Sequence, residues 1–250
     1  MVEQGGALTR AGVSLAYKRL AGRGPGVVFL GGFNSDMTGS KAEHLAERCA
    51  AEGRAFLRFD YAGHGASGGV FAEGTIGGWL DDATLMLDAL TERPQVVVGS
   101  SMGGWLALLL ALRRPGRVCG LVGVAAAPDF VRRIEAGLSD AARAEMAATG
   151  VWLRPSAYGA PYPIARRLLE EGHNHLLLEA PIPLAIPVRL VHGQRDPDVP
   201  WETSLAIAER LVSEDVRVEL IKDGDHRLST PRDLGLLWGA VAGLLSEYGG

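Results

Sequence analysis

The stretch Gly99-Ser100-Ser101-Met102-Gly103 decides the fold of this 250-residue chain. It follows the apolar residues 95–98 and precedes the apolar residues 105–110. A Gly-x-Ser-x-Gly motif between a buried strand and a helix is typical of a nucleophile elbow, a sharp turn that exposes the serine hydroxyl above the sheet. Side chains two positions before and after the serine would collide in such a turn, which accounts for both glycines. We therefore expect Ser101 in a strained backbone conformation.

Composition excludes several classes of protein. The formal net charge is −4, from 25 basic and 29 acidic residues, so nothing suggests the positive surface that nucleic acid or an anionic membrane would attract. Two cysteines, Cys49 and Cys119, fit neither a metal-binding motif nor a disulfide framework. Residues 1–6 lack the features of a signal peptide, and no apolar run approaches the roughly 20 residues of a membrane span. We expect a soluble cytoplasmic protein that needs no cofactor or metal.

Along the rest of the chain, strand and helix patterns alternate. The short strand candidates are apolar throughout, as expected when a parallel sheet is covered on both faces. Residues 13–20 fit the second arm of an opening hairpin that turns at Ala11 and Gly12. The sequence therefore predicts an α/β fold with a mostly parallel central sheet and helices on both faces. The predicted strands are 26–30, 55–59, 95–98, 118–124, 188–192 and 216–221, and the predicted helices are 41–52, 76–90, 102–114, 202–211 and 233–247.

One interval, residues 129–186, interrupts this alternation. Its pattern predicts a helix, a coil and a second helix, and prolines at 155, 161, 163, 181 and 183 interrupt it. A segment of this length without strands would be unusual as a plain connection. We expect it to form a helical cap over the active site, inserted after the sixth strand of a single domain that spans residues 1–250.

A serine hydroxyl needs an adjacent base, and the base needs a third group to orient it. On this fold the expected chain order is serine, acid, histidine. His226 is the best of six candidate histidines, because it follows the last strand in a loop at the carboxyl end of the sheet, where ligands bind. Asp196, in the loop after residues 188–192, is the favoured acid, with Asp198 and Asp129 as alternatives.

The remaining histidines have simpler interpretations. His192 precedes a glycine at a strand end and is expected to form hydrogen bonds within its loop. His44 is expected on a solvated helix face. His173 and His175 form an H-x-H pattern without neighbouring carboxylates or cysteines, so a metal site is disfavoured. The glycine-rich segment 60–68, which includes His64, lacks a Walker lysine and fits a tight structural turn better than a phosphate cradle.

An oxyanion hole should use two backbone N–H groups. One belongs to Met102, directly after the nucleophile, and the other comes from the loop after residues 26–30, where Phe33 is the expected donor.

These motifs together resemble the α/β-hydrolase superfamily of serine hydrolases. More narrowly, the chain is similar to the abhydrolase-type mitochondrial palmitoyl-protein thioesterases, also described as acyl-glucuronide esterases, and to their bacterial relatives. The resemblance rests on most of the chain, and its most specific runs are residues 32–42, 150–152 and 199–201. It implies a triad of Ser101, Asp196 and His226, the same three residues. Gly31 replaces an expected proline, and without a mitochondrial presequence a bacterial cytoplasmic relative is implied.

The predicted function is hydrolysis of a carboxylic ester or thioester, either a small molecule or an acylated protein, through an acyl-enzyme. A carbon–carbon bond hydrolase or a perhydrolase on the same triad is the alternative, and a non-catalytic binding module is a third. The sequence does not indicate an oligomeric state. An acyl pocket could be lined by Val151, Trp152, Leu153, Tyr158, Tyr162 and Ile164, and an acidic leaving group could be recognised by Arg132, Arg133, Arg154, Arg166 and Arg167.

Overall fold

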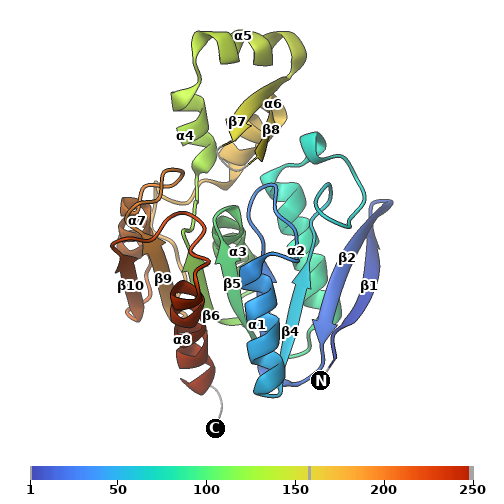
Figure 1. The fold of residues 1–250 in the computed structure, drawn as a ribbon, viewed down its shortest axis with the longest axis vertical. Helices are drawn as coiled ribbons and strands as arrows, with labels where there is room; N and C mark the ends of the chain where they lie inside the picture. Colours follow the sequence, from blue (N-terminus) through green and yellow to red (C-terminus); the bar gives the residue numbers. More distant parts are fainter. Residues whose placement is uncertain (1, 157–158, 248–250) are drawn as a thin grey trace.

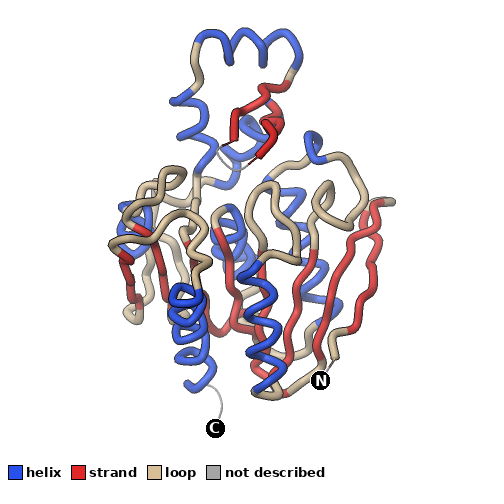
Figure 2. The backbone as a smooth tube through the Cα atoms, viewed as in Figure 1, coloured by secondary structure: helices blue, strands red, loops and turns tan. Residues whose placement is uncertain are grey.

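The computed structural model describes residues 2–156 and 159–247, and an eight-stranded sheet runs through its body (Figures 1 and 2). The strand order is β1-β2-β4-β3-β5-β6-β9-β10, with antiparallel pairing from β1 to β4 and parallel pairing from there on. The strands are β1 (Gln4–Arg10), β2 (Val13–Leu20), β3 (Arg23–Leu30), β4 (Arg54–Phe59), β5 (Gln95–Ser100), β6 (Val118–Val124), β9 (Val188–Gly193) and β10 (Val216–Ile221). The predicted mostly parallel sheet and the opening hairpin are confirmed.

Helices cover both faces of the sheet because alternate side chains of each strand point to opposite sides. In β3, Val28 and Leu30 join the core under α2 and α3, whereas Val27 and Phe29 join the core under α1 and α8. The helices of the body are α1 (Ser40–Ala51), α2 (Ile76–Leu90), α3 (Met102–Arg113), α7 (Glu202–Arg210) and α8 (Pro231–Glu247), with the 3-10 helix η1 (Phe71–Glu73) before α2. Each predicted helix of the body is present, with ends that agree to within two residues.

Helix α3 is buried over most of its length. Every residue from Met102 to Ala111 is buried, which explains why this helix is apolar on all sides. It packs directly against β5 and β6, and α2 lies beside it. The residue at its N-terminus is therefore held by a helix that packs on β5, β6 and α2.

The interval between β6 and β9 lies outside the sheet, above the carboxyl ends of its strands (Figure 1). It comprises α4 (Phe130–Gly137), α5 (Asp140–Thr149), β7 (Val151–Ser156), β8 (Gly159–Ala165), α6 (Arg166–Gly172) and the 3-10 helix η2 (His173–His175). The expectation of a coil between two helices was wrong, because β7 and β8 form an antiparallel hairpin (Figure 2). Each strand of a two-stranded ribbon has one unpaired edge, so the prolines in this hairpin do not interrupt the pairing.

Partly buried hydrogen bonds join the ends of this cap segment, residues 129–178, and attach it to the body. The carboxylate of Asp129 accepts from the N–H groups of Leu177 at 2.8 Å and Leu178 at 2.9 Å, which joins the two ends of the segment. The carboxylate of Glu171 accepts from the N–H of Gly77 at 3.1 Å, at the start of α2. Within the described residues, no helix is both long enough and apolar enough to cross a membrane.

Candidate active site

Ser101 occupies the turn between β5 and α3. Its φ is +55° and its ψ is −119°, which is unfavourable for a residue with a side chain. Backbone hydrogen bonds hold this conformation: the N–H of Ser101 donates to the carbonyl of Val124 at 2.9 Å, and its carbonyl accepts from Gly104 at 2.9 Å and Ala127 at 3.1 Å. The strained turn predicted from the motif is confirmed.

The two glycines of the motif are required for different steric reasons. A Cβ atom at Gly99 would lie 2.2 Å from the carbonyl oxygen of Gly103, which is the predicted collision across the turn. A Cβ atom at Gly103 would instead lie 2.1 Å from the carbonyl oxygen of Leu30, at the end of β3. The second glycine therefore lets α3 approach the neighbouring strand.

The structure brings Asp196 and His226 into direct contact. Oδ2 of Asp196 lies 2.7 Å from Nδ1 of His226 and 3.2 Å from Nε2 of His192. Oδ1 of Asp196 accepts hydrogen bonds of 2.8 Å from the N–H groups of Asp198 and Val199. Burial would raise the pKa of Asp196, but the hydrogen bonds from His192 and His226 outweigh it and hold the pKa well below its usual range.

The loops after β9 and β10 touch where they carry these residues. The N–H of Arg195 donates to the carbonyl of Gly224 at 2.9 Å, and the N–H of Gln194 donates to that of Ile221 at 2.8 Å. A Cβ atom at Gly193 would lie 2.3 Å from the carbonyl oxygen of Gly224, so only glycine permits this approach. Asp196 and His226, which are 30 positions apart in the sequence, are thereby placed in hydrogen-bond contact.

Ser101 and His226 line one cavity of about 220 Å³ between the cap and the carboxyl ends of the strands. Phe33 and Met102 also line it. Among the described residues, the hydroxyl of Ser101 has no hydrogen-bond partner. Ser101 and His226 therefore share a cavity but are not joined by a direct hydrogen bond. Catalytic hydrogen bonds are often long in the absence of substrate and tighten when it binds.

The predicted oxyanion donors are available. Neither the N–H of Phe33 nor that of Met102 donates a hydrogen bond within the described part of the chain. The ring of Phe33 is held edge-on by Phe71 at 4.8 Å and by Tyr162 at 5.6 Å between ring centroids, which fixes the loop that carries its N–H. Both N–H groups belong to residues that line the cavity with Ser101.

Lys41, in the first turn of α1, anchors the loop that carries His226. Its ammonium group donates a short hydrogen bond to the carbonyl of Arg227, the residue after His226. Burial, followed by the charge of Arg227, lowers the pKa of Lys41 to about 8. This contact joins α1 to the loop after β10, and a second cavity of about 300 Å³, which Ser101 and His226 also line, opens beside it.

The sequence matches a family model described as serine aminopeptidase, S33, over residues 25–170. The mouse protein named palmitoyl-protein thioesterase ABHD10, mitochondrial, is 43% identical over 94% of this chain and 80% of its own length. The human protein of that name is 41% identical over 94% of this chain and 77% of its own length. The chain belongs to this α/β-hydrolase family. The resemblance predicted from its motifs is confirmed, and the chain is a hydrolase.

Solved structures agree with this assignment. Mouse alpha/beta hydrolase domain-containing protein 10 has a TM-score of 0.91 at 43% identity, covering 98% of this chain and 99% of the mouse chain. A putative hydrolase from Agrobacterium vitis S4 has a TM-score of 0.92 at 37% identity, covering 98% of both chains. The predicted α/β-hydrolase fold is confirmed. The names of the curated relatives place them in mitochondria, so a cytoplasmic location for this hydrolase stays a prediction.

The two alternative acids, Asp129 and Asp198, make different contacts from those of Asp196. Both carboxylate oxygens of Asp129 accept backbone hydrogen bonds from the end of the cap segment, so Asp129 serves as a structural clamp. Asp198 lines the cavity and lies 4.0 Å from the guanidinium of Arg154. Ligand atoms of Asp196, Asp198 and His226 lie within 4.8 Å of one another, a spacing that a cation could use. The hydrogen bonds that already engage Asp196 account for this grouping, so we assign no metal to it.

Three of the other histidines, His192, His173 and His175, have side-chain partners. His192 is fully buried, and its Nδ1 lies 2.7 Å from Oγ of Ser204, as its predicted role in the loop implies. His44 is half-buried rather than solvated. The expectation that His173 and His175 lack neighbouring carboxylates was wrong, because Glu135 lies 2.7 Å from His173 and Glu171 lies 2.6 Å from His175. Each histidine uses a different glutamate, and neither joins a three-ligand cluster among the described residues.

The segment 60–68 is the structural turn that was predicted. Its Asp60 carboxylate accepts from the N–H groups of Met37 at 2.7 Å and Ala66 at 2.8 Å. His64 is 3% exposed, and the N–H of Asn34 donates to its Nε2 at 3.3 Å. The turn therefore supports the loop that contains Phe33.

The lining of the cavity corrects the predicted acyl pocket. Tyr162 and Ile164 line it, but Val151, Trp152 and Leu153 do not, and Tyr158 lies outside the described residues. The sequence analysis missed the contribution of α4 and its N-terminal approach, which supply Ala127, Phe130 and Ile134. Phe130 and Ile134 lie four positions apart on one face of α4, a spacing that could have identified them. Of the five cap arginines, Arg133 and Arg154 reach the cavity.

Proposed function

We propose that this hydrolase cleaves carboxylic esters or thioesters through an acyl-enzyme on Ser101. The observation that carries the proposal is the 2.7 Å contact between Nδ1 of His226 and Oδ2 of Asp196, beside a cavity that His226 shares with Ser101. An ionised Asp196 holds the imidazole with its Nε2 free to accept a proton, which is the state that a general base requires.

In the proposed reaction, Nε2 of His226 takes the proton of the Ser101 hydroxyl while the serine oxygen attacks the acyl carbon. The carbonyl oxygen becomes an oxyanion, which the N–H groups of Phe33 and Met102 stabilise. The bond to the leaving group then breaks, and His226 returns the proton to the departing oxygen or sulfur. Water attacks the acyl-enzyme in a second cycle, in which His226 again acts as base, and releases the acid.

We further propose that residues 1–250 act as one domain whose cap segment forms the acyl-binding wall. Phe130, Ile134 and Ile164 give this wall an apolar surface suited to a hydrocarbon chain. The names of the relatives suggest a palmitoyl thioester as one candidate substrate. A cavity of about 220 Å³ is smaller than the roughly 300–1,000 Å³ typical of sites for drug-sized ligands, which favours a shorter acyl group.

Labelling with a fluorophosphonate probe tests this proposal together with turnover of p-nitrophenyl butyrate. We expect the wild-type protein to form a covalent adduct on Ser101 and the Ser101→Ala variant to lack both the adduct and turnover. Ser100→Ala is the matched control, because it removes the neighbouring hydroxyl and should keep both. Equal turnover by wild type and Ser101→Ala would overturn the mechanism, and absence of adduct and turnover in the folded wild type would favour a binding module.

A further inference from the structure

The peptide group between Arg227 and Leu228, directly after His226, is held at both of its polar ends. Its carbonyl oxygen accepts a hydrogen bond from the ammonium group of Lys41, and its N–H donates to Oδ1 of Asp225 at 3.0 Å. The N–H of Arg227 donates to the same oxygen of Asp225, also at 3.0 Å. Of these three contacts, only the one with Lys41 comes from outside the loop after β10. It is the contact that ties the direction of this carbonyl group to another element of the fold.

Leu228 adopts a backbone conformation that its side chain disfavours. Its φ is +42°, in the left-handed region, which is rare for a residue with a bulky side chain and persists only where neighbouring contacts hold it. The side chain is 2% exposed and packs in the core under α1 and α8. Rotation of the preceding peptide group would change this φ and relieve the strain. The hydrogen bonds to Lys41 and Asp225 oppose that rotation.

The position of this loop decides where the ring of His226 points. The hydrogen bond with Asp196 holds Nδ1, but a ring held at one atom can still pivot about it, so the backbone next to His226 sets the direction of Nε2. Lys41 reaches the loop from the first turn of α1, which packs beside α8 (Figure 1) and buries one face in the core. Lys41, Ser101 and His226 line one cavity of about 300 Å³. The anchor and the two proposed reacting groups therefore lie around the same space.

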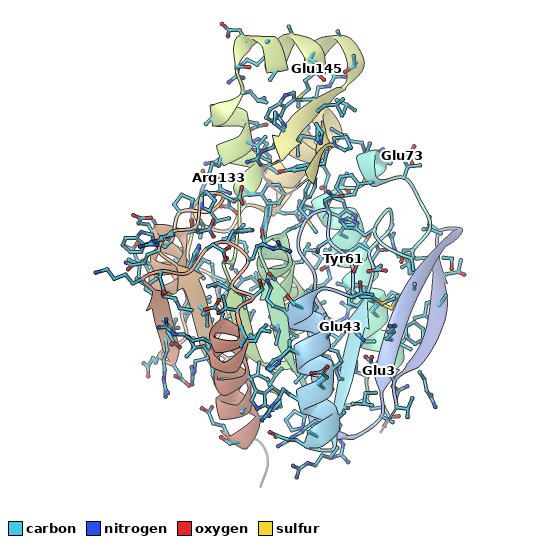
Figure 3. All side chains as sticks on the ribbon, viewed as in Figure 1. Glu3, Glu43, Tyr61, Glu73, Arg133 and Glu145 are labelled. Atoms are coloured by element: carbon cyan, nitrogen blue, oxygen red, sulfur yellow. The ribbon has the colours of Figure 1, made fainter. Side chains whose placement is uncertain are left out.

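Lys41 carries its charge in surroundings that disfavour it. Burial, followed by the charge of Arg227, lowers its pKa to about 8. On β4, which also packs on α1, Arg58 pairs instead with Glu3 and Glu43 (Figure 3). The ammonium group is therefore present at neutral pH and is lost as the pH rises through about 8. The charged or titratable groups that face it are Arg227, Asp225 and His226 in the loop after β10, Asp233 on α8, and Asp36 in the loop before α1.

We propose that Lys41 is a positioning residue for the catalytic base: its hydrogen bond to the carbonyl of Arg227 holds the strained peptide before Leu228 and so keeps Nε2 of His226 directed into the cavity that it shares with Ser101. The inference rests on the proposed function and adds a residue that acts through the backbone of the base without touching substrate. A charge-assisted hydrogen bond is roughly twice as strong as a neutral one, so a neutral amine would hold the peptide less firmly. Both steps of the proposed reaction use His226, so a loosened loop lowers kcat and leaves KM nearly unchanged.

Lys41→Met tests the proposal, because it keeps an unbranched side chain and removes the ammonium group. We expect kcat for p-nitrophenyl butyrate at pH 7 to fall about tenfold, with KM within about twofold of wild type, as the loss of one charge-assisted hydrogen bond implies. Titration of Ser101 with a fluorophosphonate probe counts the active sites, so misfolded protein does not enter kcat. Lys222→Met is the matched control, because it removes the same charge from an exposed position in the loop after β10, and it should keep both constants.

The pH profile separates positioning from stability. We expect wild-type kcat to decline about fivefold as the pH rises through about 8, and Lys41→Met to lack this decline. Ser101→Ala, measured at each pH, supplies the rate of non-enzymatic hydrolysis. Between about 8 and the ordinary value of 10.5, the unfolded chain binds a proton at Lys41 that the folded chain does not, so this residue makes the fold more stable as the pH rises. Unfolding caused by Lys41 therefore cannot account for the decline in kcat.

Leu228→Gly tests the strained peptide, because glycine adopts a positive φ without the steric cost. In this background Lys41→Met should lower kcat less than about threefold, since less strain opposes the active position of the loop. A wild-type kcat in Lys41→Met, an equal loss in Lys222→Met, or an alkaline decline that survives in Lys41→Met would overturn the role of Lys41. The full tenfold loss in the Leu228→Gly background would overturn the part assigned to the peptide. In each case Ser101-dependent turnover by the wild type would still support the proposed function, whereas turnover that survives in Ser101→Ala would overturn both.

Discussion

At the scale of single residues, Asp196 carries a negative charge in a place where burial alone would neutralise it. Its side chain is inaccessible to solvent, yet two histidines and two backbone N–H groups surround its oxygens. These hydrogen bonds keep its pKa below the usual range for a carboxyl group. The charge therefore persists below the pH at which an ordinary carboxyl group is protonated, and it can orient His226 and stabilise its protonated form.

Asp196→Asn tests that role, because it keeps the size of the side chain and removes the charge. We expect kcat to fall about 10³- to 10⁴-fold, since an amide can hold the wrong tautomer of the imidazole. Steady-state kinetics with p-nitrophenyl butyrate measures the loss, and urea unfolding checks that the variant is folded.

Asp198→Asn and Asp129→Asn are the matched controls for this measurement. Asp198 occupies the same loop, and Asp129 is the alternative acid at the end of β6. We expect each to lower kcat less than tenfold. A loss in Asp129→Asn comparable to that in Asp196→Asn, with the fold intact, would assign the acid to Asp129 instead.

At the scale of elements, glycine has opposite effects in α3 and in α8. Gly103 is fixed by contact with the carbonyl of Leu30, so Gly103→Ala forces α3 away from β3. In contrast, Gly239 is exposed on α8, and a Cβ atom there would meet no atom within 4 Å. The first glycine permits a close approach, and the second only weakens a helix.

Urea unfolding of the two alanine variants measures this difference. We expect Gly103→Ala to lower the free energy of unfolding by about 3 kcal/mol or more through overpacking. Gly239→Ala should raise it by about 0.5–1 kcal/mol, because alanine loses less backbone entropy in a helix. Destabilisation by Gly239→Ala would show that α8 contacts something at this position that the structure does not indicate.

The turn that contains His64 makes stability depend on pH. Burial, partly opposed by a hydrogen bond with the carbonyl of Ala62, lowers the pKa of His64 from 6.5 to about 4. Between these two values the unfolded chain binds a proton that the folded chain does not, so stability decreases as pH falls from about 6.5 to 4 and this contribution levels off below 4. The free energy of unfolding decreases by about 3 kcal/mol over this pH range because of His64.

His64→Gln removes this titration and keeps an acceptor for the N–H of Asn34. Free energies of unfolding at a series of pH values from 7.5 to 4 should decrease less steeply in the variant than in the wild type. Comparing the two curves cancels the contributions of the carboxyl groups that both proteins share. Parallel curves would show that His64 is protonated in the folded protein or exposed to solvent.

At the scale of the whole molecule, the cavity exists only because the cap segment lies on the body. Ser101 and His226 come from the body, whereas Tyr162 and Ile164 come from the cap. Asp129 and Glu171 hold the segment in place through backbone hydrogen bonds at its two ends. The packing of the cap therefore sets the size of the cavity, and under the proposed function it would limit the length of the acyl chain.

A series of p-nitrophenyl esters from acetyl to palmitoyl tests this dependence. Each methylene that enters the cavity contributes up to about 0.8 kcal/mol, so kcat/KM should rise over the first members, and it should fall once the cavity of about 220 Å³ is filled. Ile164→Ala enlarges the cavity and should move the optimum to a longer chain, while Leu153→Ala, at an exposed position outside the cavity, should not. A continuous rise to palmitoyl would contradict a closed acyl pocket.

The sequence by itself determined the alternation of strands and helices, the position of the elbow and the loops that carry the proposed triad. These features depend on local chemistry: apolar period, glycines at a sharp turn and the order of residues along strands whose carboxyl ends meet at one edge. For the same reason Gly99 could be assigned its steric role from the motif, whereas the contact of Gly103 with Leu30 appeared only in the tertiary structure.

Only the tertiary structure decided which residues of the cap face Ser101. The β7–β8 hairpin, the apolar lining from α4 and the selection of Arg133 and Arg154 among five cap arginines all depend on how segments distant in sequence pack together. Prolines in the hairpin gave a local signal for coil, and pairing between two strands with free edges overrode it. Local periodicity states which side of a helix is buried, but it does not state what that side is buried against.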